Sequence, residues 1–166
     1  MQEIKVENVI IGKQFENSEN LQKFLEIVKK NKINVNVVEE GKRINIEKDL
    51  YFDILWPSSE NVIQENSINN NALVCKLQYK KFSMLFTGDI EEETEKVLVS
   101  KYSNTNILKS SILKVAHHGS KSSSIKEFLE LVNPKLVLVG VGKDNKFGHP
   151  NDEVIERLRN IRCKYL

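Results

Sequence analysis

The sequence predicts an α/β protein, with hairpin strands in its first half, residues 1–88, and alternating strands and helices in its second half, residues 89–166. Two observations indicate this class. Up to residue 88, apolar runs of strand length are broken by turn residues, and beyond it such runs are followed by a polar loop and a helix-like segment. The chain has 166 residues, 40% of them hydrophobic and 29% charged, which fits one globular domain with its own core.

The first half is expected to contain one helix and several strands. Apolar residues recur at helical spacing over 17–31, and Asn17 or Ser18 can cap the start of that helix. Strands are predicted over 33–38, at two places within 40–57, and over 72–78 and 81–87. A short polar turn separates the last two strands, which predicts a hairpin, and the Asn- and Ser-rich segment 58–71 is expected to be a loop.

The second half is expected to alternate between helices and strands. Helices are predicted over 90–102, 124–133 and 151–161, and strands over 112–116, 135–141 and 163–166. In α/β sheets, ligands bind in the loops that follow the carboxyl ends of strands. Three polar motifs occupy such loops: Thr87-Gly88-Asp89, His117-His118-Gly119-Ser120 and Gly148-His149-Pro150. We therefore expect these motifs to converge on one rim of the sheet.

Two candidate residues also have a purely structural explanation. Asp89 directly precedes a predicted helix, where a carboxylate can cap the first turn, although one of its oxygens can also hold a metal ion. His149 lies in a turn before a helix that Asn151 can cap, and a histidine at that place can also reach a neighbouring site as a general acid. The residues alone leave both alternatives open.

His117 and His118 are two of only three histidines in the chain. Adjacent side chains point in different directions, so one can bind a metal ion while the other hydrogen-bonds a substrate or a group behind the ligand. Gly119 permits a turn that is closed to other residues, and a serine at 122–124 is expected to cap the next helix. Because no acidic partner or nucleophile elbow surrounds these serines, a Ser-His-Asp hydrolase is not expected.

Taken in order, the three motifs resemble the metallo-β-lactamase-like domain of ComEC-type DNA-internalisation proteins of bacterial competence and their free-standing metallo-hydrolase relatives. The resemblance runs from about residue 40 to the C-terminus. It implies an αββα sandwich with a binuclear centre of zinc or manganese that activates water to attack a phosphodiester. It implies that Asp89 is the bridging carboxylate and that His118 is the late metal ligand. His117, beside that ligand, and His149, beside the reacting phosphate, are then the catalytic residues.

One feature departs from the family pattern. The principal metal motif of the family, His-x-His-x-Asp-His, is absent, and no histidine precedes His117. Three histidines and one aspartate cannot complete two metal sites that each need about four ligands. The sequence thus resembles the second half of such a domain with the hairpin layer before it, a truncated single domain over 1–166. We expect an exposed apolar surface and a partner there, either the missing N-terminal half or a second copy of the chain.

The resemblance implies a phosphodiesterase or nuclease linked to DNA uptake, with DNA or another phosphodiester as its substrate and little activity in this chain alone. Two alternatives remain open: hydrolysis of other phosphoesters or esters, and a degenerate domain that binds without chemistry. Lysines around the paired histidines can meet phosphates, although surface lysines are more often simply solvated. These lysines are Lys109, Lys114, Lys121 and Lys126.

The sequence also carries an expectation about location. No apolar run is long enough to cross a membrane, and the first ten residues do not have the pattern of a signal peptide. We therefore expect a soluble chain, cytoplasmic if it is made alone and extracytoplasmic if it is part of a ComEC-type membrane protein. The net charge of +2 neither requires nor excludes a nucleic-acid partner.

Overall fold

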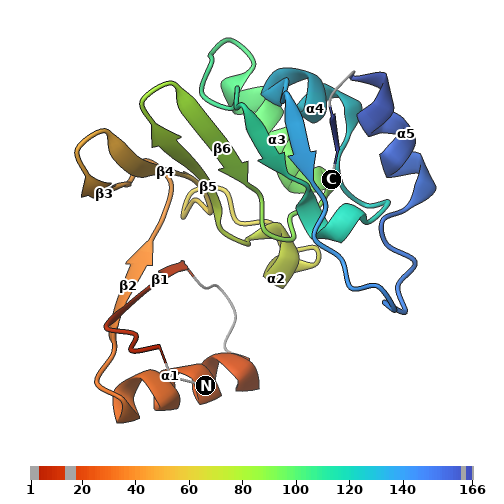
Figure 1. Cartoon of the computed structure of the whole chain (residues 1–166). Helices are drawn as coiled ribbons and strands as arrows, with labels where there is room; N and C mark the ends of the chain where they lie inside the picture. The colour runs from red at the N-terminus through yellow and green to blue at the C-terminus, as the bar shows by residue number, and fades with distance from the viewer. Residues whose placement is uncertain (1–3, 14–17, 162–163, 166) are drawn as a thin grey trace.

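The computed structural model describes residues 4–13, 18–161 and 164–165. Within these residues a seven-stranded sheet forms the main body, and a smaller β-α-β unit projects from it (Figure 1). The main sheet has the order β3-β4-β5-β6-β7-β8-β9, so its neighbouring strands are also consecutive in the chain. Its strands are β3 (Arg43–Glu47), β4 (Leu50–Trp56), β5 (Val74–Tyr79), β6 (Phe82–Phe86), β7 (Ile112–Lys114), β8 (Leu136–Leu138) and β9 (Lys164–Tyr165). The predicted α/β class is confirmed.

The direction of strand pairing changes in the middle of this sheet. β3 to β6 pair in antiparallel fashion and form the expected hairpins, whereas β6 to β9 run parallel. Parallel strands need crossover connections, and these contain α3 (Glu92–Tyr102), α4 (Lys126–Val132) and α5 (Asp152–Asn160). β9 lies within the last predicted strand, of which residues 163 and 166 are outside the described part of the chain. The carboxyl ends of β6, β7 and β8 therefore share one edge of the sheet.

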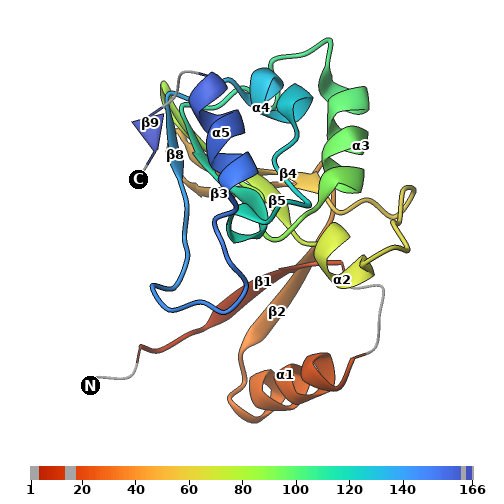
Figure 2. The same cartoon turned by 90° about the vertical axis from the view of Figure 1, so that its right-hand side faces the viewer.

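The three crossover helices cover one face of the main sheet (Figure 2). Leu85, Leu113 and Val137 come from three adjacent central strands and are at most 1% exposed. Phe128 of α4 and Leu158 of α5 belong to the same buried cluster. Burying a large apolar side chain of this kind contributes about 1.5–3 kcal/mol to stability. This layer fixes the helices, and with them the loops at the carboxyl edge.

The opposite face of the main sheet is apolar but only partly buried. Side chains alternate between the two faces of a strand, so the residues next to the buried ones point away from the helices. Strand pairing aligns six of them in one row, which we call the apolar row: Ile44, Phe52, Leu77, Met84, Ile112 and Leu136. Among the described residues, no helix packs on this row (Figure 2). A partly exposed apolar face was expected from the sequence.

The smaller unit consists of β1 (Asn8–Gly12), α1 (Glu19–Lys30) and β2 (Asn34–Val38), and its two strands pair in parallel. The Ser18 hydroxyl accepts the N–H of Leu21 and caps α1 as expected, while Asn17 lies outside the described residues. β1 is not among the strands predicted from the sequence, because its short apolar run offers no clear period. Together, β1, α1 and β2 thus add a parallel strand pair with a helix to the hairpins of the first half.

Two local predictions are wrong. The segment 58–71 is not only a loop, since the short helix α2 (Ser67–Asn70) forms within it. No serine side chain caps α4 either. Instead, the buried carboxylate of Glu95 in α3 accepts the main-chain N–H groups of Ser124 and Ile125, at 2.7 and 2.8 Å. A carboxylate from the neighbouring helix therefore satisfies the donors that a local serine was expected to satisfy.

Candidate metal site

The three polar motifs lie together at the carboxyl edge of the parallel strands, as expected. The His117 N–H donates to the Gly88 carbonyl over 3.1 Å, and the Asn151 N–H donates to the Gly119 carbonyl over 2.9 Å. These main-chain hydrogen bonds join the loop after β6 to the loop after β7, and that loop to the start of α5. The structure thus gathers the four predicted site residues: Asp89, His117, His118 and His149.

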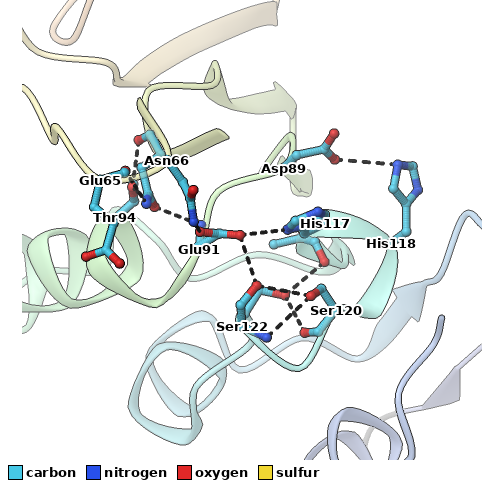
Figure 3. Close-up of polar contacts among 12 residues, drawn as sticks. Glu65, Asn66, Asp89, Glu91, Thr94, His117, His118, Ser120 and Ser122 are labelled. Carbon is cyan, nitrogen blue, oxygen red and sulfur yellow. Dashed lines mark hydrogen bonds and ion pairs between the residues drawn. The ribbon is translucent and has the colours of Figure 1, made fainter. Parts of the chain in front are cut away.

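A tight turn, η1 (Ala116–Gly119), carries both adjacent histidines. His117, His118 and Gly119 have positive φ angles of 46°, 54° and 80°, a conformation that is uncommon outside glycine. Gly119 is also required for space, because a Cβ there would lie 2.8 Å from the Cβ of Pro150. The two imidazoles leave this turn toward different carboxylates, as Figure 3 shows.

His118 and Asp89 form the first of two polar pairs. The Nδ1 atom of His118 lies 2.5 Å from the Gly140 carbonyl, which can only accept a hydrogen bond, so Nδ1 carries the proton. The Nε2 atom then faces Oδ1 of Asp89 at 3.6 Å. A cation or a second proton between these two acceptors would turn the contact into an attraction. Metal-binding histidines are commonly oriented by such a bond from the other ring nitrogen to a carbonyl, so the pair fits two metal ligands.

Asp89 is not the cap of the helix that follows it. The N-cap position of α3 is occupied by Glu91, and the Asp89 side chain is about half exposed and directed at His118 (Figure 3). No group of three or more His, Cys, Asp or Glu side chains within the described residues is able to hold a metal ion. Asp89 and His118 therefore fit part of a metal site, and other ligands must be added to complete it.

His117 and Glu91 form the second polar pair. Oε1 of Glu91 lies 3.3 Å from Nδ1 of His117, but the ring is not turned to make a hydrogen bond. The buried Glu91 carboxylate accepts hydrogen bonds from the Asn66 amide at 2.8 Å and from the Ser122 hydroxyl at 3.1 Å (Figure 3). No acidic partner was expected near these serines, and this prediction is wrong, because the Ser122 hydroxyl donates to Glu91. Glu91 stands two residues after Asp89, on the far side of a buried Ile90.

His149 lies next to His117, with ring centroids 5.8 Å apart and the rings edge to face. Its Nδ1 atom is buried and has no hydrogen-bond partner in the described part of the chain. Burial lowers the pKa of His149, and the nearby His117 and His118 lower it further. Asn151 caps α5 as predicted, since its side chain accepts the N–H of Glu153 at 3.0 Å. This loop therefore provides both the cap of α5, from Asn151, and an imidazole at the site, from His149.

Of the four lysines near the paired histidines, Lys114 is already bound to main-chain groups of the protein. Its ammonium donates to the carbonyls of Gly88 and Val115, at 3.3 and 3.2 Å, and burial lowers its pKa. The other three are exposed, namely Lys109, Lys121 and Lys126. Of the four, Lys109, Lys121 and Lys126 have side chains that face solvent and can meet a phosphate.

No protein-family model matches the sequence. The chain is 32% identical over 162 residues to ComE operon protein 3 of Bacillus subtilis, covering 98% of this chain and 20% of that protein. It is 33% identical over 115 residues to Competence protein ComA of Neisseria gonorrhoeae, covering 69% of this chain and 16% of that protein. Recombination protein 2 of Haemophilus influenzae is 32% identical over 113 residues, 68% of this chain and 13% of that protein. The chain thus spans a fifth or less of these relatives.

Solved structures share the fold at low sequence identity. The metallo-beta-lactamase fold protein YhfI from Bacillus subtilis has a TM-score of 0.50 and 6% identity, over 95% of this chain and 61% of that one. An isothiocyanate hydrolase from Delia radicum gut bacteria has 0.51 and 12%, over 96% and 64%. CmlA, a diiron beta-hydroxylase from Streptomyces venezuelae, has 0.54 and 11%, over 95% and 38%. At these identities the likeness shows the fold alone.

The sheet, its crossover helices and the loops at its carboxyl edge define a protein of the metallo-β-lactamase fold. Within that class, the chain belongs with the ComEC-type competence proteins and corresponds to a segment of them. Both statements confirm the resemblance drawn from the three motifs. No helix in the described residues is both long enough and apolar enough to cross a bilayer.

Proposed function

We propose that the chain forms one wall of the active site of a metal-dependent phosphodiesterase that cuts DNA in a competence-linked parent protein. The observation that carries this proposal is the convergence of three loops that set Oδ1 of Asp89 and Nε2 of His118 3.6 Å apart. The link to competence comes from the names of the relatives. The activity belongs to the whole protein, of which this chain matches a part.

In this proposal, Asp89 and His118 would hold zinc or manganese. A pair of divalent ions lowers the pKa of a bound water and stabilises the negative charge on phosphate oxygens. A carboxylate and an imidazole Nε2 are both suitable ligands for these metals. The Gly140 carbonyl supports this role, because it holds His118 in the tautomer whose Nε2 lone pair faces Asp89.

His117 and His149 act on the substrate rather than on the metal. His149 donates a proton to the leaving oxygen as the phosphodiester bond breaks, the usual role of a general acid. His117 binds a phosphate oxygen through Nε2, since its Nδ1 is buried and lies 3.3 Å from Oε1 of Glu91. Glu91 is a positioning residue, because it acts on the substrate only through the orientation of His117.

The remaining ligands come from a segment with a His-x-His-x-Asp-His motif that packs on the apolar row. Two features support this partner: the row is only partly buried, and an αββα sandwich has a second sheet on that face. A second copy of the chain is the alternative occupant when that segment is absent. In a ComEC-type parent the completed domain lies on the extracytoplasmic side of the membrane.

Metal analysis tests the ligand assignment. The segment that precedes the matched region of ComE operon protein 3 of Bacillus subtilis is fused to this chain, and the fusion is purified and analysed for zinc and manganese. We expect bound metal in the parent fusion, its loss in His118→Ala and its retention in His149→Ala, since His149 is proposed to lie off the metal. Equal metal in all three proteins would show that His118 is not a ligand.

Cleavage of DNA by the same fusion tests the activity. Asp89→Asn is expected to abolish cleavage with manganese or zinc, because a negatively charged carboxylate ligand becomes a neutral amide. Asp49→Asn is the matched control, since Asp49 lies in the turn between β3 and β4 rather than at the carboxyl edge. Cleavage by Asp89→Asn at the wild-type rate contradicts the proposal. A faster reaction with a generic phosphodiester than with DNA favours other phosphoesters as the substrate.

A second candidate is a domain that binds without chemistry. The absence of a complete metal-binding group among the described residues favours it for the chain on its own. In that case the fusion binds no metal, and DNA binding does not change when His118 is replaced. Metal that disappears with His118→Ala excludes this candidate.

A further inference from the structure

A cavity of about 350 Å³ opens directly beside the candidate site. Its lining contains both His118 and His149, so it continues from the place where we put the reacting phosphate. The remaining lining residues are Gly140, Val141, Gly142, Asn145 and Phe147. Main-chain atoms, an aliphatic side chain and an aromatic ring dominate this list, and none of these five residues carries a charge. Such a wall suits a flat, weakly polar group better than another phosphate.

Phe147 projects into solvent at the edge of this cavity and is 81% exposed. Its ring stacks on the His149 imidazole, with centroids 5.9 Å apart and planes 20° apart. A single exposed apolar side chain is common on proteins and by itself indicates nothing. Here, however, the exposed ring extends a stack that begins at a candidate catalytic histidine. His149 lies against part of the ring, and the largely exposed remainder offers a surface for a further planar group.

Asn145 holds the loop that presents this ring. Its side-chain amide donates to the carbonyls of Gly142 and His149, at 3.1 and 2.7 Å. Its side-chain oxygen accepts the N–H groups of Phe147 and His149, at 3.2 and 3.0 Å. These four hydrogen bonds fix the backbone on both sides of Phe147. The backbone that carries the ring is therefore ordered in advance of binding, which reduces the ordering entropy that a ligand must overcome.

Two exposed lysines, Lys143 and Lys146, belong to the same loop. Sites for single-stranded nucleic acid combine cationic side chains that follow the backbone with aromatic rings on which bases stack. In duplex DNA the base faces are already covered by their neighbours, so a protruding ring reaches them only after unstacking. The loop 142–149 thus has the two components of a single-strand site beside the candidate catalytic histidines.

We propose that the cavity beside His149 is a base-binding subsite, in which a nucleotide of single-stranded DNA stacks on Phe147 next to the reacting phosphate. The proposal rests on the phosphodiesterase function proposed above and names the form of its substrate. Lys143 and Lys146 contact phosphates on either side of the stacked base. Phe147 is then a specificity-determining residue that distinguishes single strands from duplexes.

Binding of a fluorescein-labelled single-stranded DNA oligonucleotide to the full chain without metal tests this subsite by anisotropy. Stacking on an aromatic ring contributes about 1–3 kcal/mol per base, so Phe147→Ala is expected to weaken binding by about 5- to 150-fold. Phe147→Trp is expected to restore it. Phe82→Ala is the matched control, since Phe82 is 40% exposed but lies at the opposite end of β6. That control is expected to bind like the wild type.

An oligonucleotide of the same length with abasic sites separates stacking from charge. It keeps the phosphates and lacks the bases, so Phe147→Ala is expected to leave its weak binding unchanged. The slope of affinity against salt is also expected to stay the same in Phe147→Ala, because stacking releases no counterions. Equal loss with the normal and abasic strands, or equal binding of duplex and single strand, overturns the subsite.

The outcomes for subsite and activity are separable. If Phe147→Ala binds the single strand as tightly as the wild type, the base-binding subsite is wrong, and the metal and cleavage assays of the fusion remain to decide the activity. If the strand depends on Phe147 but the fusion holds no metal, the activity is wrong, and single-strand binding stands as a property of the loop.

Discussion

Glu95 is a buried carboxylate whose ionisation is expected to make the folding of this chain depend on pH. It is fully buried in α3, and burial raises its pKa from 4.5 to about 7. The N–H groups of Ser124 and Ile125, with the more distant charge of Arg157, favour the ionised form and oppose the effect of burial only in part. Folding therefore takes up a proton when the pH lies between the pKa of Glu95 in the unfolded chain and its pKa in the folded chain.

The size of this effect follows from the shift. Because the pKa is raised on folding, the folded chain binds more protons than the unfolded chain between about pH 4.5 and 7, so stability falls as the pH rises through that window. One pKa unit corresponds to about 1.4 kcal/mol, so the free energy of unfolding is expected to fall by about 2–3 kcal/mol between pH 5 and 8 because of Glu95 alone. Its stabilising proton is fully present below the unfolded pKa and is lost above the folded one.

Urea unfolding of wild type and Glu95→Gln at several pH values between 5 and 8 measures the contribution of Glu95 to the free energy of unfolding. The amide cannot ionise, so the difference in free energy of unfolding is expected to move by about 2–3 kcal/mol in favour of the variant as the pH rises. Taking the difference removes the contribution of other titrating groups. Glu127→Gln, on the exposed side of α4, is expected to parallel the wild type. If Glu95→Gln also runs parallel to the wild type, Glu95 does not titrate in this range.

Three further predictions concern the loops and the open face. Gly119→Ala is expected to destabilise the chain by about 1–3 kcal/mol more than Gly148→Ala in urea unfolding. Both glycines have positive φ, but only at Gly119 would a Cβ lie 2.8 Å from Pro150. Equal losses of stability in the two variants contradict the clash. Glu91→Gln is expected to lower kcat of the completed domain by about 10- to 100-fold with little change in bound metal, and co-loss of metal contradicts a role through His117. Leu77→Lys is expected to shift the chain toward monomer in sedimentation, and an unchanged distribution argues against association through the apolar row.

The elements nearest the site could be predicted because their signals are local. The apolar runs of β5 and β6 flank a short polar turn, and Asn151 carries a capping side chain immediately before α5. The cap of α4 could not be predicted in the same way, since Glu95 lies 29 residues before Ser124 and meets it only after α3 and α4 pack together. Local capping rules apply to helix ends whose free N–H groups are bound by a side chain nearby in the sequence. The N–H groups at the start of α4 are bound by Glu95, which is distant in the sequence.

The candidate site shows the same division between local and distant signals. The position of each motif after a strand was enough to predict that Asp89, His118 and His149 would converge. The pairing of His117 with Glu91 depends on two consecutive positive φ angles, which the sequence indicates only through the glycine that follows them. Phe147 offers no sequence signal beyond its place before Gly148, and its stacking on His149 is visible only in the folded loop.

The bonds that join the three loops have a consequence for how this fold changes over time. They run from the His117 N–H to the Gly88 carbonyl and from the Asn151 N–H to the Gly119 carbonyl, and neither uses a side chain. An imidazole or carboxylate at the rim can therefore be exchanged while the scaffold that displays it persists. Solved structures that share the overall fold include both a hydrolase and a diiron hydroxylase. The side chains that carry the chemistry can therefore change in evolution while the main-chain hydrogen bonds that hold the loops together stay the same.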